Sequence, residues 1–169
     1  MLRADSPPRA AGFDAVEIQF PYEHEPGRLA AAARAANVEV VVINAPVALT
    51  ATASGWRACR NCATSSAAGS NVWRNMRRCS EYITSTCSRV WASADEDSTA
   101  RRTLVDNLAL AAERLEGIAR VLLEPINPHD VPGYLVDRFD AARSVTSTAR
   151  AAVGLQFDVY HAACMGSIR

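Results

Sequence analysis

The chain has 169 residues, of which 49% are hydrophobic and 21% are charged, and this balance is ordinary for one globular domain with a core. Its 18 basic residues equal its 18 acidic ones, so bulk charge favours neither a nucleic acid nor an anionic membrane as a partner. No apolar run is long enough to cross a bilayer, and the N-terminal residues lack the apolar segment of a secretory signal. We therefore expect a cytoplasmic protein.

The N-terminal part alternates between strand-like and helix-like segments. Residues 13–20 combine aromatic and β-branched side chains and end before a proline, which predicts a strand. Residues 28–36 are rich in alanine and predict a helix, and residues 38–44 are mostly β-branched and predict a second strand. This order is typical of a βαβ unit.

The same alternation resumes at about residue 95. Ser98 or Thr99 can cap a helix that runs to about Leu115, and Gly117 can close it. The pattern then predicts a strand, a helix and a further strand, at residues 118–124, 136–152 and 153–158. Strands that alternate with helices indicate a parallel sheet, so the fold class is α/β.

The middle segment, residues 49–92, does not follow this alternation. It lacks helical or strand periodicity, and we expect it to be irregular. Cys59 and Cys62 have a zinc-ligand spacing, but Cys79 and Cys87 are too far apart to form a second such pair, so a zinc-binding module is the weaker interpretation. Residues 22–25 resemble a metal-binding cluster by composition, but a solvated loop is the favoured interpretation.

Two predicted strands end in a carboxylate. Glu124 follows the apolar run that starts at Val121, and Asp158 follows the run that starts at Leu155. Because the carboxyl ends of parallel strands meet at one edge of a sheet, we expect both side chains at the same mouth. Carboxylate oxygens suit a hard divalent cation, so the pair predicts a metal site.

Seven short strings on both sides of the middle segment resemble hydroxypyruvate isomerase, a member of the xylose-isomerase-like group of TIM barrels. The two flanking regions cover roughly two thirds of the chain, and the strings are at residues 11–17, 20–22, 44–46, 102–108, 123–128, 132–134 and 155–161. The Glu-Pro-Ile-Asn and Gln-Phe-Asp-Val-Tyr-His strings are fairly specific in combination, whereas each alone would be a weak signal.

The resemblance implies an incomplete (β/α)8 barrel. The predicted strands resemble the second, third, fifth and sixth of the barrel; the fourth falls in the middle segment, and the first, seventh and eighth have no counterpart. An open barrel exposes sheet edges, which predicts marginal stability and self-association through those edges.

The middle segment departs from the family throughout, and codon arithmetic offers a cause. If the reading frame is shifted by one base, several codon pairs such as Trp56-Arg57 and Trp73-Arg74 are forced to encode alanine. The shifted segment can then encode a helix followed by a strand. We therefore hypothesise two compensating frameshifts, near residues 47–49 and 92–94, within a single partial barrel domain of residues 1–169.

The resemblance also implies a reaction. It is the interconversion of hydroxypyruvate and tartronate semialdehyde by proton transfer through an enediolate, assisted by Mg²⁺ or Mn²⁺. By resemblance Glu124 is a catalytic carboxylate and a metal ligand, Asp158 is a metal ligand, and His161 and Asn127 bind the substrate, with His129 near the mouth.

Three interpretations of the activity remain open. The second catalytic glutamate of the family has no counterpart in the matched strings, so we expect this chain by itself to be inactive. A related 2-oxo sugar acid such as 2-oxo-tetronate is an alternative substrate. A non-catalytic remnant, or a module that depends on a partner chain, is a further alternative.

Overall fold

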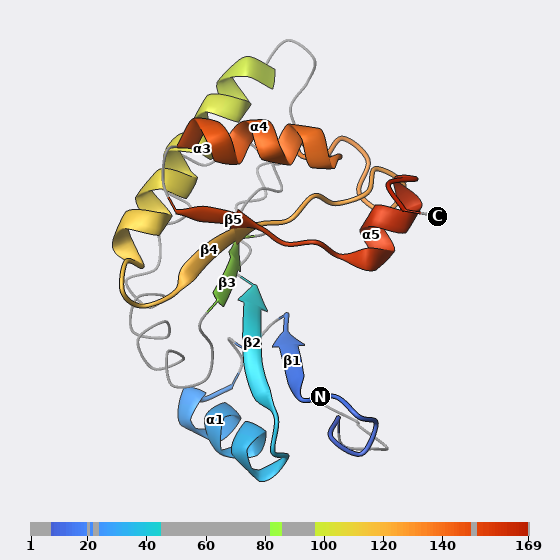
Figure 1. Ribbon diagram of the computed structural model, residues 1–169. Coiled ribbons are helices and arrows are strands. Elements are labelled where there is room, and N and C mark those ends of the chain that lie inside the picture. The colour runs from blue at the N-terminus through green and yellow to red at the C-terminus, as the bar shows by residue number, and fades with distance from the viewer. Residues whose placement is uncertain are drawn as a thin grey trace.

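A five-stranded parallel sheet forms the centre of the protein (Figure 1). The computed structural model describes residues 8–19, 21, 24–44, 82–85, 97–149 and 152–168. The strands are β1 (Ala15–Ile18), β2 (Glu39–Asn44), β3 (Tyr82–Ser85), β4 (Arg120–Leu123) and β5 (Val153–Leu155). The helices are α1 (Pro26–Ala35), α3 (Asp97–Arg114), α4 (Phe139–Ala149) and α5 (Val159–Cys164).

The strands lie side by side in the same order as in the chain, and each neighbouring pair is parallel. This arrangement is the one by which a TIM barrel winds around its axis. The described strands do not close, because β1 and β5 are the two outer strands of the sheet. The predicted α/β class and parallel sheet are therefore confirmed, and self-association through the outer strands stays a prediction.

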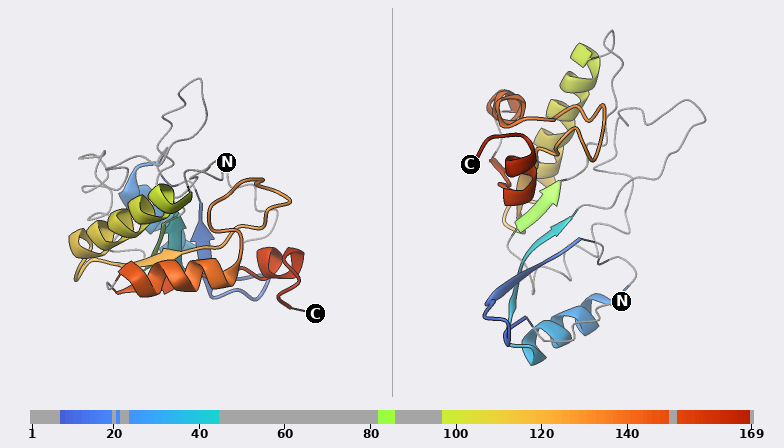
Figure 2. Two further views of the ribbon diagram at one scale, coloured as in Figure 1. Left: turned by 90° about the horizontal axis from the view of Figure 1, so that it is seen from above. Right: turned by 90° about the vertical axis from the view of Figure 1, so that its right-hand side faces the viewer.

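Two separate apolar cores hold the helices against the sheet. α3 and α4 pack against each other and cover the β4–β5 end of the sheet, whereas α1 lies at the β1–β2 end (Figures 1 and 2). In the larger core, Leu108 of α3, Leu123 of β4 and Val145 of α4 are each at most 1% exposed. Burial of one such side chain contributes about 1.5–3 kcal/mol, so this core fixes the end of the sheet that carries Glu124.

The predicted elements are present, but several of their ends differ. α3 already begins at Asp97, so Ser98 and Thr99 lie inside its first turn and neither is the cap. α4 begins only at Phe139, because Val136 before it is fully buried in a turn whose carbonyl accepts from the Ile126 backbone N–H. The local apolar pattern does not distinguish a buried turn from the start of a helix.

A short strand lies in the segment that was expected to be irregular. β3 pairs with β2 on one side, Ile83 opposite Ile43, and with β4 on the other, Ile83 opposite Val121. The expectation that residues 49–92 lack a strand is therefore wrong at these four positions. Backbone pairing on both sides and the β-propensity of Tyr, Ile and Thr suffice for a strand this short. The remainder of the segment, including Cys59, Cys62, Cys79 and Cys87, lies outside the described residues.

Of the metal-like cluster at residues 22–25, the structure describes His24 and Glu25, which lie just before helix α1. Glu25 is the N-cap of α1, and its carboxylate accepts hydrogen bonds from the Gly27 and Arg28 backbone N–H groups at 3.0 and 2.9 Å. His24 beside it is exposed. An acidic N-cap satisfies backbone donors that the helix itself leaves open, which supports the structural interpretation.

Candidate active site

Glu124 is a buried carboxylate at the carboxyl edge of the sheet. It follows directly after the last residue of β4 and is only 6% exposed. Burial is the main cause that raises its pKa, and the negative charges of Glu17 and Asp158 raise it further, to about 7 from the usual 4.5. A carboxyl group that titrates near neutral pH can both accept and release a proton, which is the property a proton-transfer catalyst needs.

Glu17 of β1 is the second carboxylate at this edge, although its strand is the far outer strand of the sheet. Its pKa is raised by partial burial and by the charge of Asp158, while a hydrogen bond from Gln156 opposes the rise. That bond joins Gln156 Nε2 to Glu17 Oε2 at 3.2 Å, and the Gln156 backbone N–H also donates to the carbonyl of Leu123. Gln156 therefore links the segment after β5 to both β4 and β1.

Glu17 was not expected to be a site residue from the sequence. The available signal was a single charged side chain between Val16 and Ile18 in an otherwise apolar strand. Glu17 itself is on the exposed face of this strand, where a charged side chain is common, so the local pattern is a weak signal. Its interaction with residues near position 156, however, cannot be deduced from local pattern.

Glu17, Glu124 and Asp158 bring three carboxyl groups to one edge of the sheet: besides burial, the charges of Glu17 and Asp158 raise the pKa of Glu124, and the charge of Asp158 raises the pKa of Glu17. Within the described part of the chain, none of the three forms a salt bridge. The predicted proximity of Glu124 and Asp158 is thus supported electrostatically. Unpaired carboxylates that repel each other favour protonation of one of them or the approach of a cation.

The same side chains meet only part of the requirement for a metal ion. Carboxylate oxygens have the right chemistry for Mg²⁺ or Mn²⁺. Yet among the residues that the structure describes, no group of three or more His, Cys, Asp and Glu side chains is arranged to hold a metal. Glu124 and Asp158 are therefore two candidate ligands rather than a complete coordination set.

Asp158 has a structural role in addition. The predicted strand at 153–158 ends at Leu155, and Asp158 is the N-cap of the short helix α5. Its Oδ1 accepts a hydrogen bond from the His161 backbone N–H at 2.8 Å. This bond fixes the Asp158 carboxylate and the start of α5 relative to each other.

Asn127 is fully buried and uses its whole side-chain amide within the protein. Its Oδ1 accepts from the backbone N–H groups of His129 and Asp130, both at 3.0 Å. Its Nδ2 lies 2.9 Å from Asp130 Oδ2 and 2.7 Å from His161 Nδ1. These contacts give Asn127 a structural role between the loop after β4 and helix α5, and substrate binding by Asn127 stays a prediction.

Tyr160 and Asp130 extend this network. Hydrogen bonds from Asn127 and from Tyr160 hold the pKa of Asp130 below its usual range. The same bond and the charge of Asp130 raise the pKa of Tyr160 to about 12. Tyr160 and His161 therefore both attach α5 to the loop at residues 127–130. His161 lies in the network as expected, whereas the exposed His129 contributes only its backbone N–H.

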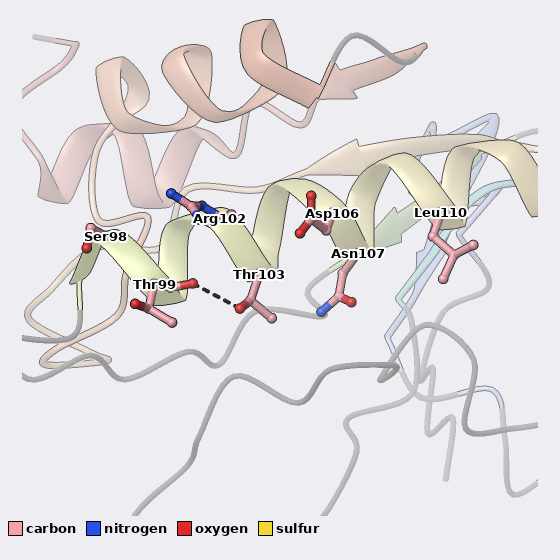
Figure 3. A pocket seen from close by; sticks show the side chains of 7 residues that line it. All are labelled: Ser98, Thr99, Arg102, Thr103, Asp106, Asn107 and Leu110. Atoms are coloured by element: carbon pink, nitrogen blue, oxygen red, sulfur yellow. Dashed lines mark hydrogen bonds between the residues drawn. The ribbon is translucent and has the colours of Figure 1, made fainter.

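A separate cavity of about 460 Å³ lies on one face of α3 (Figure 3). Its lining residues within the described part of the chain come from this helix, and Thr103 Oγ1 donates to the Thr99 carbonyl at 2.9 Å within it. None of the carboxylates described above lines this cavity. It is thus not part of the candidate active site.

Comparison with known proteins identifies the family. Residues 9–168 match the xylose isomerase-like TIM barrel family. The chain belongs to this family. In the described residues, no helix has both the length and the apolar character to span a membrane.

Two curated relatives agree with this assignment. The chain is 33% identical over 164 residues to a 2-oxo-tetronate isomerase of Cupriavidus necator, and 28% identical over 163 residues to a putative hydroxypyruvate isomerase of Caenorhabditis elegans. Each alignment covers 90% of this chain and 60% of the relative. The chain thus spans less than two thirds of the length of these relatives.

Solved structures support the fold. An AP endonuclease of family 2 from Brucella melitensis superposes with a TM-score of 0.72 at 22% identity, over 94% of this chain and 62% of that one. A xylose isomerase domain protein from Alicyclobacillus acidocaldarius superposes with a TM-score of 0.62 at 18% identity, over 92% and 57%. These likenesses show the fold of the chain.

Proposed function

We propose that the carboxyl edge of this sheet is the site of an aldose–ketose type isomerisation, with a small 2-oxo or 2-hydroxy acid as substrate and Glu124 as the proton-transfer group. The observation that carries the proposal is the burial of Glu124 beside two further carboxylates, with a pKa of about 7. The names of the two curated relatives, both isomerases, give the reaction class.

Hydroxypyruvate is the first candidate substrate. Its isomerisation needs a base that removes a proton from the hydroxymethyl carbon and leaves an enediolate. The hydroxyl proton then moves from the oxygen of the former hydroxymethyl carbon to the former carbonyl oxygen, and return of a proton to the former carbonyl carbon gives tartronate semialdehyde. Glu124 is near half ionised at neutral pH, so its ionised form can take the proton from carbon and its protonated form can return one.

The other residues at this edge support Glu124. The charges of Glu17 and Asp158 keep its proton affinity high, and His161 would donate a hydrogen bond to a substrate oxygen as negative charge develops there. A divalent cation held by Glu124 and Asp158 would polarise the substrate carbonyl. Because the described residues do not complete a metal site, the proton transfer is assigned to Glu124 and not to that cation.

2-Oxo-tetronate is the second candidate substrate. It is favoured by the 33% identity to the relative that bears this name. The two substrates share the 2-oxo acid end and differ in the carbon chain beyond it, so the carboxyl edge described here serves either.

An isomerase assay with hydroxypyruvate and 2-oxo-tetronate as parallel substrates tests the proposal. The assay should be run with and without Mg²⁺ or Mn²⁺, and with Glu124→Gln as the matched inactive variant. The matched strings by themselves predict an inactive chain, but the burial of Glu124 beside Glu17 leads us to expect turnover of one substrate by the wild-type chain and none by Glu124→Gln. A folded wild-type chain with no reaction on either substrate would support the non-catalytic alternative instead.

A further inference from the structure

We propose that Asn127 is a positioning residue that selects between the two neutral tautomers of His161 and places the proton on Nε2, so that His161 presents one N–H donor to a substrate oxygen. The inference about the tautomer stands on the hydrogen bonds alone, and its consequence for catalysis rests on the proposed function. Asn127 would act through His161 and would not itself touch the substrate.

The hydrogen bonds around Asn127 fix the orientation of its side-chain amide. Two backbone N–H groups, those of His129 and Asp130, both point at its Oδ1 at 3.0 Å. Only the oxygen of the amide can accept from two donors. The carbonyl end of the amide therefore faces the loop, and the NH2 end must face the other way, toward Asp130 and His161.

The two hydrogens of the Asn127 NH2 group each face a hydrogen-bond acceptor. One side of Nδ2 faces Asp130 Oδ2 at 2.9 Å, and the low pKa of that carboxyl keeps it an acceptor. The other faces His161 Nδ1 at 2.7 Å, and the Asn127 backbone N–H approaches the same nitrogen at 3.4 Å. Two donors thus face Nδ1, which can accommodate them only as an unprotonated acceptor.

The tautomer follows from this geometry. A neutral imidazole carries one proton, so an accepting Nδ1 places the proton on Nε2. Asn127 is 0% exposed, so water cannot replace a lost bond, and a proton on Nδ1 would leave buried donors facing another donor. Among the described residues, no hydrogen bond engages Nε2, which leaves its N–H available to a ligand.

Contacts at the start of α5 hold the His161 ring in place. His161 lies in the first turn of α5, and its backbone N–H is bound by Asp158, the N-cap carboxylate. Tyr160 attaches the same turn to Asp130. The ring is therefore held by Asn127 of the loop, and the backbone that carries the ring is held by Asp158. A neutral, pre-oriented N–H donor stabilises an oxygen on which negative charge develops during enediolate formation.

Nitrogen-15 NMR of the histidine rings tests the inference directly. Long-range ¹H–¹⁵N spectra of the full chain near neutral pH distinguish the two tautomers, and His161→Gln assigns the signal among the three histidines. We expect the Nε2–H form of His161 to predominate at least tenfold. A dominant Nδ1–H form, or an even mixture of the two neutral tautomers, would overturn the inference.

Asn127→Asp is the informative variant, because it replaces the NH2 donor with an acceptor of the same shape. It should place a proton on Nδ1 of His161, and in an active chain it should lower the proton-exchange rate about 100-fold with little change in KM. An unchanged His161 signal would contradict the inference. His129→Gln is the matched control and should leave the His161 signal unchanged, since the His129 ring is exposed.

The NMR result separates this inference from the proposed function. A chain without isomerase activity can still show the Nε2–H tautomer, and an active chain can show the wrong one. If Asn127→Asp does not fold, the wild-type spectrum decides the inference by itself.

Discussion

Gln156 donates a hydrogen bond to Glu17 at 3.2 Å, and this bond connects the segment after one outer strand of the sheet to the other outer strand. Its two residues are 139 positions apart in the chain. The bond brings the charge of Glu17 into the neighbourhood of Glu124 and Asp158. The acidity of Glu124 therefore depends on a strand at the opposite edge of the sheet.

The first prediction concerns the effect of Glu17 on Glu124. Glu17→Gln removes one of the two charges that oppose ionisation of Glu124, so the pKa of Glu124 should fall below about 7. Carbon-13 NMR titration of the glutamate carboxyl groups measures this shift. The exposed residue Glu116 provides a control, because Glu116→Gln should leave the titration of Glu124 unchanged. A Glu124 pKa that does not move in Glu17→Gln would contradict the described cluster.

The second prediction is a pH dependence of stability that arises from Glu124. Between pH 4.5 and about 7 the unfolded chain releases this proton while the folded chain retains it. The free energy of unfolding should therefore fall by about 3 kcal/mol as pH rises through this range, and level off above it. Urea unfolding at several pH values measures the fall.

Glu124→Gln is the matched variant for this experiment, because it keeps the shape of the side chain and has no proton to lose. Its stability relative to wild type should increase as pH rises from 4.5 to about 7. Wild-type and variant curves that stay parallel over this range would exclude the proposed shift. Glu116→Gln should follow the wild-type curve.

The third prediction separates two roles of Asp158. Asp158→Ala removes the N-cap of α5 and should lower the free energy of unfolding by about 1 kcal/mol. Asp158→Asn retains a capping oxygen and should cost only a few tenths of a kcal/mol. The two variants should be compared at a pH below the pKa of Glu124, where Glu124 is protonated and its charge does not affect the free energy of unfolding. An equal loss in the two variants would mean that the hydrogen bond to the His161 N–H is not the stabilising contact.

The sequence predicts the alternation of strands and helices well, because the apolar pattern of each element is local. The helix that contains Leu104 and Leu108 and the strand that leads to Glu124 are both where their patterns place them. The two short elements, β3 and α5, were missed. β3 has four residues and is stabilised by pairing with β2 and β4, and α5 has six and depends on the Asp158 cap.

The candidate site was predicted in part for the same reason. Glu124 and Asp158 could be placed together because parallel strands end at one edge. Glu17 could not, because its link to Gln156 arises only when the sheet curves. Asn127 was expected near a substrate, but the sequence could not show that backbone N–H groups and His161 would occupy its amide.

The central claim, that Glu124 removes a proton from a carbon next to a carbonyl, can be tested without complete turnover. Proton removal alone lets solvent deuterium enter the substrate, so the exchange needs only one of the two carboxylates of the family reaction. Proton NMR of hydroxypyruvate in D₂O, with added Mg²⁺ or Mn²⁺, should show loss of the hydroxymethyl signal faster with the wild-type chain than with buffer and metal alone. Glu116→Gln should match the wild type and Glu124→Gln should match the buffer. Equal exchange by the wild-type chain and Glu124→Gln would contradict the account.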